Sequence, residues 1–140
     1  MSADRVFLDT NVLVYAYDAS EPVKRARART LLADLEDAVV STQVLAELYV
    51  ALTRVGGVKP PVAPADAEAA VTSLSELTVV VVDVSMVLAG VRRARQSRLS
   101  LWDAMIVEAS LAANCDRLLT EDLQHSQRFG DLAVENPFRS

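Results

Sequence analysis

Cysteine and histidine are almost absent from this 140-residue chain, which contains only Cys115 and His125. A single cysteine cannot form an intramolecular disulfide or a cysteine-based zinc site. We therefore expect Cys115 to lie buried in apolar surroundings, and redox chemistry is not favoured. Nothing beside His125 resembles an acid–base pair, so we expect this side chain on the surface.

Long hydrophobic runs are also missing. The longest apolar stretch is LTVVVVDV at residues 77–84, which contains Asp83 and is far shorter than the roughly 20 residues that span a bilayer. The opening MSADRVFLDT has neither the apolar segment nor the cleavage site of a secretory signal. These absences predict a cytoplasmic protein without a membrane partner.

Basic residues are in the minority, with 14 against 19 acidic ones, and the net charge is -5. Such a surface repels nucleic acid unless basic residues cluster or a cation intervenes. Two basic runs, at residues 24–29 and 92–98, contain Lys24, Arg25, Arg27 and Arg29, and Arg92, Arg93, Arg95 and Arg98. Solvated helix faces are the usual role of such runs, and phosphate contacts are the alternative.

Hydrophobic residues make up 51% of the chain, which is enough for one compact domain over residues 1–140. Four strands are predicted by apolar runs at residues 5–9, 38–41, 77–84 and 116–120, the first of them buried, and an edge strand is predicted at 131–138. Helical spacing or capping signals predict helices over 11–18, 22–37, 43–54, 66–74, 85–96 and 100–115, with a loop at 56–64.

Alternating strands and helices predict an α/β fold with helices on both faces of a mainly parallel sheet of four to five strands. The valine-rich run at residues 77–84 is expected to form a strand covered on both faces. Ligands in such folds gather outside the carboxyl ends of the strands. Asp9 ends the first predicted strand and TED at 120–122 ends the fourth, so both segments are candidates for a site.

Two further acids lie in apolar surroundings. Glu47 is at the margin of the apolar stripe of QVLAELYVAL, and Asp103 lies in the first turn of LSLWDAMIVEAS. Carboxylates brought together repel one another unless protons or a cation neutralise them. All-oxygen ligands favour Mg²⁺ or Mn²⁺.

Each acid also has a purely structural interpretation. Asp9 can form an Asx-turn, Asp103 completes a capping box with Ser100, and Asp122 can cap a helix. Glu47 can simply reach water. Thr10 or Asn11 is expected to cap the first helix.

Taken together, four segments resemble the motifs of the PIN domain family, and specifically the VapC-type ribonuclease toxins. They are FLDTNVLVYAYD, QVLAELYVALTR, LSLWDAMIVEAS and LLTEDLQHSQRF, followed by a closing NPF at 136–138. The resemblance covers nearly the whole chain and implies a three-layer α/β/α fold. It also implies that the metal-binding catalytic acids are Asp9, Glu47, Asp103 and Asp122, with Asn11 and Thr120 as supporting polar residues.

The resemblance further implies a Mg²⁺- or Mn²⁺-dependent endoribonuclease that hydrolyses RNA, is neutralised by a VapB-type antitoxin and forms a homodimer. The sequence leaves open whether the neighbouring Glu121 assists or replaces Asp122. Ser126 departs from the family, which often has glycine there, and Leu101 stands where many relatives have an aromatic residue. Trp102 and Tyr49 are expected in the core or at a subunit contact.

Three other interpretations are weighed. A receiver-like phosphoacceptor needs an acidic pair after the first strand and a late lysine, but residues 9–11 are Asp-Thr-Asn and no lysine follows Lys59. A dehalogenase-type phosphatase needs an aspartate where Asn11 stands. A non-catalytic PIN-like module that binds RNA or protein is the main alternative, and the presence of all four acids argues against it.

Overall fold

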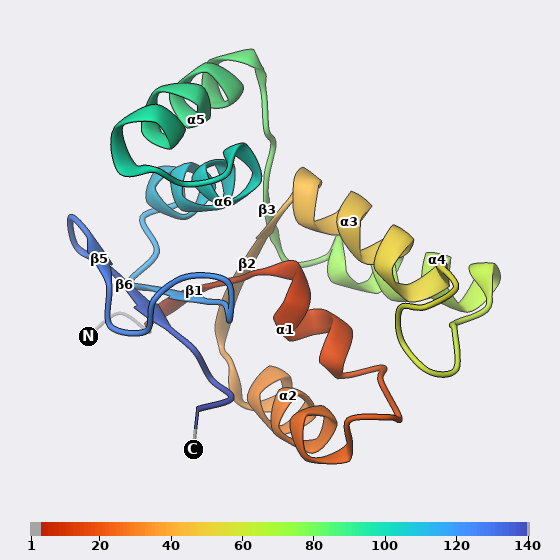
Figure 1. The fold of residues 1–140 in the computed structure, drawn as a ribbon. Helices are drawn as coiled ribbons and strands as arrows, with labels where there is room; N and C mark the ends of the chain where they lie inside the picture. The colour runs from red at the N-terminus through yellow and green to blue at the C-terminus, as the bar shows by residue number, and fades with distance from the viewer. Residues whose placement is uncertain (1–3, 140) are drawn as a thin grey trace.

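The computed structural model describes residues 4–139, in which each of the first three strands is followed by a pair of helices and three strands end the order of elements (Figure 1). The strands are β1 (Arg5–Leu8), β2 (Asp37–Ser41), β3 (Thr78–Val80), β4 (Arg117–Leu119), β5 (Arg128–Phe129) and β6 (Leu132–Glu135). The helices are α1 (Thr10–Tyr15), α2 (Pro22–Asp34), α3 (Thr42–Thr53), α4 (Pro64–Leu74), α5 (Val84–Ser97) and α6 (Leu101–Ala112). None of these helices is long and apolar enough to cross a membrane.

The strands form one sheet in the order β3-β2-β1-β4-β6-β5. All neighbours pair in parallel except β5, which is antiparallel to β6. The predicted α/β class and mainly parallel sheet are confirmed. The sheet has six strands rather than four to five, because the two-residue β5 is too short to leave a periodic signal.

Two expectations about the sheet edges are wrong. The strand predicted at residues 131–138 is not an edge strand, because β6 lies between β4 and β5. The valine-rich strand β3 is itself an edge, and its residues are exposed or only half-buried. A run of valines does not separate a covered strand from an edge strand, since β-branched residues favour both.

The direction of the connections determines the layers. From β1 to β2 to β3 the chain moves toward one edge, and α1 to α4 lie in these crossovers. From β3 it returns past β2 and β1 to β4 through α5 and α6. Right-handed crossovers in opposite directions place their helices on opposite faces, and α5 and α6 pack together apart from the α1, α2, α3 and α4 group (Figure 1).

The core lies along the central strands. Val6, Phe7 and Leu8 of β1 are completely buried, as are Leu118 and Leu119 of the adjacent β4. Such near-continuous apolar runs are typical of parallel strands covered on both faces. Cys115 is buried as expected, and burial raises the pKa of its thiol to about 12.

Side-chain caps fix where the helices of the site begin. The N-cap of α1 is Asp9, which accepts a hydrogen bond from Thr10 N at 2.7 Å, so the expectation of Thr10 or Asn11 is wrong. Ser100 caps α6 through a hydrogen bond from Asp103 N at 3.1 Å. Asp9 and Asp103 are therefore held at helix starts, where carboxylates are favoured.

The segment after β4 turns sharply before the chain enters β5. Ser126 has a φ of 70°, in the left-handed region that glycine occupies most readily, which matches the glycine common at this position in the family it resembles. His125 is half-buried, and its Nδ1 accepts a hydrogen bond from Asn136 N at 3.1 Å. The histidine thus ties this segment to the chain after β6.

Replacing a core leucine with alanine is expected to reveal how much the helix layer contributes. Leu48 of α3 is fully buried, so Leu48→Ala should lower the free energy of unfolding by about 3 kcal/mol through lost burial and a residual cavity. Guanidinium unfolding measures the change. Val50→Ala in the same helix is the matched control, since Val50 is 58% exposed and should lose less than about 0.5 kcal/mol; equal losses would contradict this view of the core.

Candidate functional site

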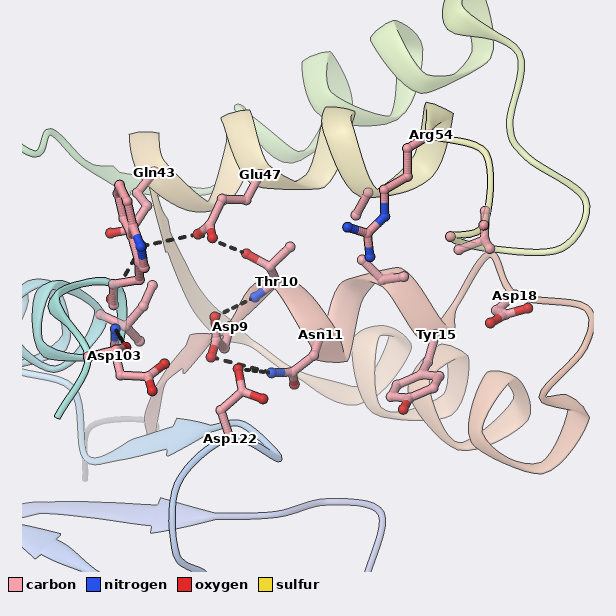
Figure 2. A pocket seen from close by; sticks show the side chains of 18 residues that line it. Asp9, Thr10, Asn11, Tyr15, Asp18, Gln43, Glu47, Arg54, Asp103 and Asp122 are labelled. Atoms are coloured by element: carbon pink, nitrogen blue, oxygen red, sulfur yellow. Dashed lines mark hydrogen bonds between the residues drawn. The ribbon is translucent and has the colours of Figure 1, made fainter.

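A pocket of about 530 Å³ lies between one face of α1 and one face of α3 (Figure 2). The α3 side is formed by residues spaced by three or four positions, as one helix face requires: Gln43, Glu47, Ala51 and Arg54. The α1 side and its continuation provide Thr10, Asn11, Val14, Tyr15 and Asp18. The start of α6 and Asp122 border the same pocket, together with residues 56–58.

The register of β1 against β4 creates the deepest part of this site. Leu8 pairs with Leu119, so the next residues, Asp9 and Thr120, lie side by side where both strands end. Asp9 N donates to Leu119 O at 3.1 Å, and Thr120 Oγ1 donates to Asp9 Oδ2 at 2.8 Å. Asp9 is only 5% exposed and Thr120 is completely buried.

Two more carboxylates converge on Asp9. Asp103, from the first turn of α6, and Asp122, from the loop after β4, each place an oxygen so that the three oxygens lie within 4.8 Å of one another. Thr120 also fixes this loop, because Asp122 N donates to Thr120 Oγ1 at 3.0 Å. Three acids that are far apart in the sequence thus form one acidic cluster.

Asn11 lies at the centre of the contacts that support this cluster. Its Nδ2 donates to Asp122 Oδ2 at 3.0 Å and approaches Asp9 Oδ2 at 3.4 Å and Thr120 Oγ1 at 3.3 Å. Its Oδ1 accepts from Glu121 N at 3.2 Å. One amide therefore bridges the acids after β1 and β4, and the predicted supporting role of Asn11 and Thr120 at a metal site remains a prediction.

Burial and mutual repulsion make the cluster costly in its fully ionised form. Burial raises the pKa of Asp9 to about 7, against the lowering effect of hydrogen bonds from Thr120 and Thr10, and the charges of Asp122 and Glu47 raise it further. Burial is also the main cause that raises the pKa of Asp103, with a further contribution from Asp122. A cation would relieve both effects.

Glu47 faces the acids from α3 without joining the group of three (Figure 2). Gln43 Nε2 donates to its Oε1 at 3.1 Å, and Thr10 Oγ1 lies 3.5 Å from the same atom. Gln43 Nε2 is also 3.3 Å from the carbonyl oxygen of Trp102, at the start of α6. The predicted participation of Glu47 in metal binding remains a prediction.

The alternative between Glu121 and Asp122 has a geometric answer. Glu121 accepts hydrogen bonds from the hydroxyl of Tyr15 and from Lys24 Nζ, the latter at 3.1 Å. Phe138, from the NPF segment, packs edge-on against Tyr15 with ring centroids 4.8 Å apart. Glu121 therefore belongs to a neighbouring contact between α1, α2 and the C-terminal segment, whereas Asp122 faces the acids.

Two aromatic residues lie outside the core. Trp102 is 61% exposed and borders the pocket, and Tyr49 is 39% exposed, so neither packs in the core, and a subunit contact for either stays a prediction. The two basic runs do not line the pocket, and two of their members are paired within the described chain, Lys24 with Glu121 and Arg93 with Glu108. Sequence reasoning missed Arg54, although its spacing from Glu47 could have revealed a shared helix face.

The donor set suits a hard divalent cation. Asp9, Asp103 and Asp122 offer only carboxylate oxygens, and the raised pKa of the buried Asp9 shows that its negative charge is poorly compensated by the protein alone. Mg²⁺ and Mn²⁺ prefer carboxylate oxygens together with retained water. The residues present therefore fit such an ion.

Comparison with families of known proteins shows that residues 6–129 match the family described as PIN domain. A toxin–antitoxin complex from Klebsiella pneumoniae matches with a TM-score of 0.69 and 17% identity, over 96% of this chain and 99% of that chain. VapC20 from Mycobacterium tuberculosis, a sarcin-ricin loop cleaving toxin, matches with a TM-score of 0.64 and 18% identity, over 81% of this chain and 86% of that chain. DNA-bound VapBC from Salmonella typhimurium matches with a TM-score of 0.62 and 20% identity, over 96% of this chain and 98% of that chain. No curated protein matches the chain significantly.

The free energy of unfolding should depend on pH through Asp9 when divalent metal is chelated. Its folded-state pKa of about 7 exceeds the unfolded value of about 3.9. The folded state then holds the proton on Asp9 more tightly than the unfolded state does. The stabilisation of the fold by this proton is therefore complete below about pH 4 and is lost as the pH rises to about 7. Relative to Asp9→Asn, wild type should lose on the order of 3 kcal/mol between about pH 5 and pH 8, measured by guanidinium unfolding; parallel curves would contradict this.

Divalent cations should raise the melting temperature through the three-acid cluster. At about 100 times its dissociation constant, a ligand specific to the folded state contributes about 2.7 kcal/mol. Thermal unfolding with Mn²⁺ or Mg²⁺ should therefore show a rise of several degrees in wild type and a much smaller rise in Asp103→Asn. Asp34→Asn, an exposed position at the end of α2, is the matched control. An identical rise in all three proteins would place the ion elsewhere.

Proposed function

The chain belongs to the PIN domain family, and from this membership we propose that it is a metal-dependent endoribonuclease that acts in the cytoplasm as the toxin of a VapBC-type pair. We further propose that residues 1–140 constitute a single domain. The observation that carries the proposed activity is the convergence of Asp9, Asp103 and Asp122 within 4.8 Å at the edge where β1 and β4 end. In open α/β sheets this edge is where ligands bind.

In this proposal Asp9, Asp103 and Asp122 hold Mg²⁺ or Mn²⁺. When bound, the ion would lower the pKa of a coordinated water and would neutralise charge on the phosphoryl group under attack. Glu47 faces the same space from α3 and either orients the attacking water or contributes to a second ion. Asn11 and Thr120 keep the three carboxylates in place through the hydrogen bonds that cross between them.

Two partners are part of the proposal. Several structurally similar proteins are toxin–antitoxin complexes by their own descriptions, which supports a VapB-type antitoxin for this chain. An arginine of such an antitoxin would suit the acidic cluster, because guanidinium binds carboxylates in fork geometry. A homodimer is supported by an exposed apolar stripe on α5 at the spacing of one helix face, formed by Val84, Val87, Leu88 and Val91.

The activity is tested by incubating purified, antitoxin-free protein with total cellular RNA in Mg²⁺, in Mn²⁺ and in chelator. Wild type and Asp34→Asn should cut RNA only with metal, and Asp103→Asn should lose activity by at least about 100-fold, because a missing ligand removes transition-state charge stabilisation. Mapping the new ends identifies the substrate.

Folding of each variant is checked by its unfolding curve. Intact RNA with wild type under every condition would contradict the proposal and favour a PIN-like module that binds RNA or protein without cutting it. Equal cleavage by Asp103→Asn would contradict the assignment of the cluster.

A further inference from the structure

The pocket continues well beyond the acidic cluster. Asp103 and Asp122 border one end of it, and Arg54 lies toward the other end together with Asp18 (Figure 2). Residues 56–58, after α3, also line the pocket. Its volume of about 530 Å³ lies in the range of pockets that hold whole organic ligands and greatly exceeds the space of a hydrated ion. The part of the pocket near Arg54 has no role in the chemistry proposed above.

Arg54 stands out by its charge. Five acids and one base line the pocket within residues 4–139, and Arg54 is that base. No ion pair of Arg54 occurs among the described residues, so its guanidinium is available to a ligand. Figure 2 shows the side chain directed from α3 toward α1, across the pocket.

The helix fixes how far this cation lies from the acids. Arg54 follows Glu47 by seven residues, which is nearly two turns of α3, so both point from the same face about 10 Å apart along the axis. Ala51 lies between them on this face, and its small side chain leaves the pocket open from one end to the other. A ligand that reaches both ends must therefore be longer than a single phosphate.

The loop after α3 packs closely on the Arg54 side chain. A Cβ on Gly57 would lie 2.6 Å from Ala51 O, 3.0 Å from Arg54 Cγ and 3.2 Å from Arg54 Nε. Only glycine permits this approach, and the Gly57 backbone consequently confines the arginine stem on the pocket side. A guanidinium confined before binding loses less entropy when it meets its ligand.

We propose that Arg54 binds a backbone phosphate of the RNA, one or a few nucleotides away from the bond held at the acidic cluster. The inference rests on the proposed nuclease function and extends it from the scissile phosphate to the neighbouring strand. A polyanion reaches the acidic end through a bound cation and the other end through Arg54, whose planar fork suits phosphate oxygens. Arg54 is thus a positioning residue for single-stranded RNA.

The test measures RNA binding separately from cleavage. All proteins keep the acidic cluster, and Ca²⁺ replaces Mg²⁺ to prevent cleavage. The probe is a short, fluorescently labelled single-stranded RNA of random sequence, followed by anisotropy at several salt concentrations. Adding Arg54→Gln should weaken binding about tenfold, as expected for a hydrogen bond to a charged group. It should also reduce the slope of log K against log salt by about 0.7, the value for one phosphate contact on a single strand.

Two further variants separate a phosphate contact from a general charge effect. Arg54→Lys keeps the charge and should retain the salt slope while losing part of the affinity, because the fork is lost. Arg128→Gln removes the same charge from the distant strand β5 and should leave both quantities nearly unchanged. In Mg²⁺, where the RNA is cut, Arg54→Gln should raise KM with kcat retained.

Each outcome distinguishes the inference from the function on which it rests. If RNA binds and is cut but Arg54→Gln behaves like Arg128→Gln, the phosphate contact is overturned, the nuclease stands, and an acidic peptide becomes the ligand that fits Arg54. If no protein in the series binds or cuts RNA, both proposals are overturned.

Discussion

Burial of the Asp9 carboxylate is the constraint on which the rest of the site depends. Asp9 follows a strand in the middle of the sheet and is 5% exposed, so its charge must be compensated locally. Thr120 and Asn11 supply hydrogen bonds, yet its pKa is still raised to about 7. The polar residues gathered around β1 and β4 therefore compensate only part of the charge, and a proton or a cation can compensate the rest.

The same residue joins local structure to the site. As N-cap of α1, Asp9 accepts from Thr10 N, and this contact begins the helix that carries Asn11. The carboxylate thus has a structural role and faces the pocket at the same time, because its second oxygen contacts Thr120. Structural and chemical interpretations of an acid at a strand end are not exclusive, and single acids in a sequence cannot be assigned to one alone.

Much of the fold and cluster could be predicted, because strong apolar runs end in polar residues at Asp9 and Thr120. What could not be predicted depends on contacts between distant segments. Glu121 and Asp122 are neighbours in sequence, and only Lys24 and Tyr15, about a hundred residues earlier, draw Glu121 away. The exposure of Trp102 and the orientation of Arg54 likewise depend on where α6 and the loop after α3 lie in space, which helical periodicity does not specify.

The placement of the acids along the chain has a consequence for synthesis. Asp9 is made about a hundred residues before its partners Asp103 and Asp122, and β4 must pair with β1 before the cluster exists. A ribosome that has translated as far as residue 100 has produced α1 to α5 but not the acids of α6 and of the loop after β4. The three-acid cluster therefore cannot assemble until translation has passed Asp122.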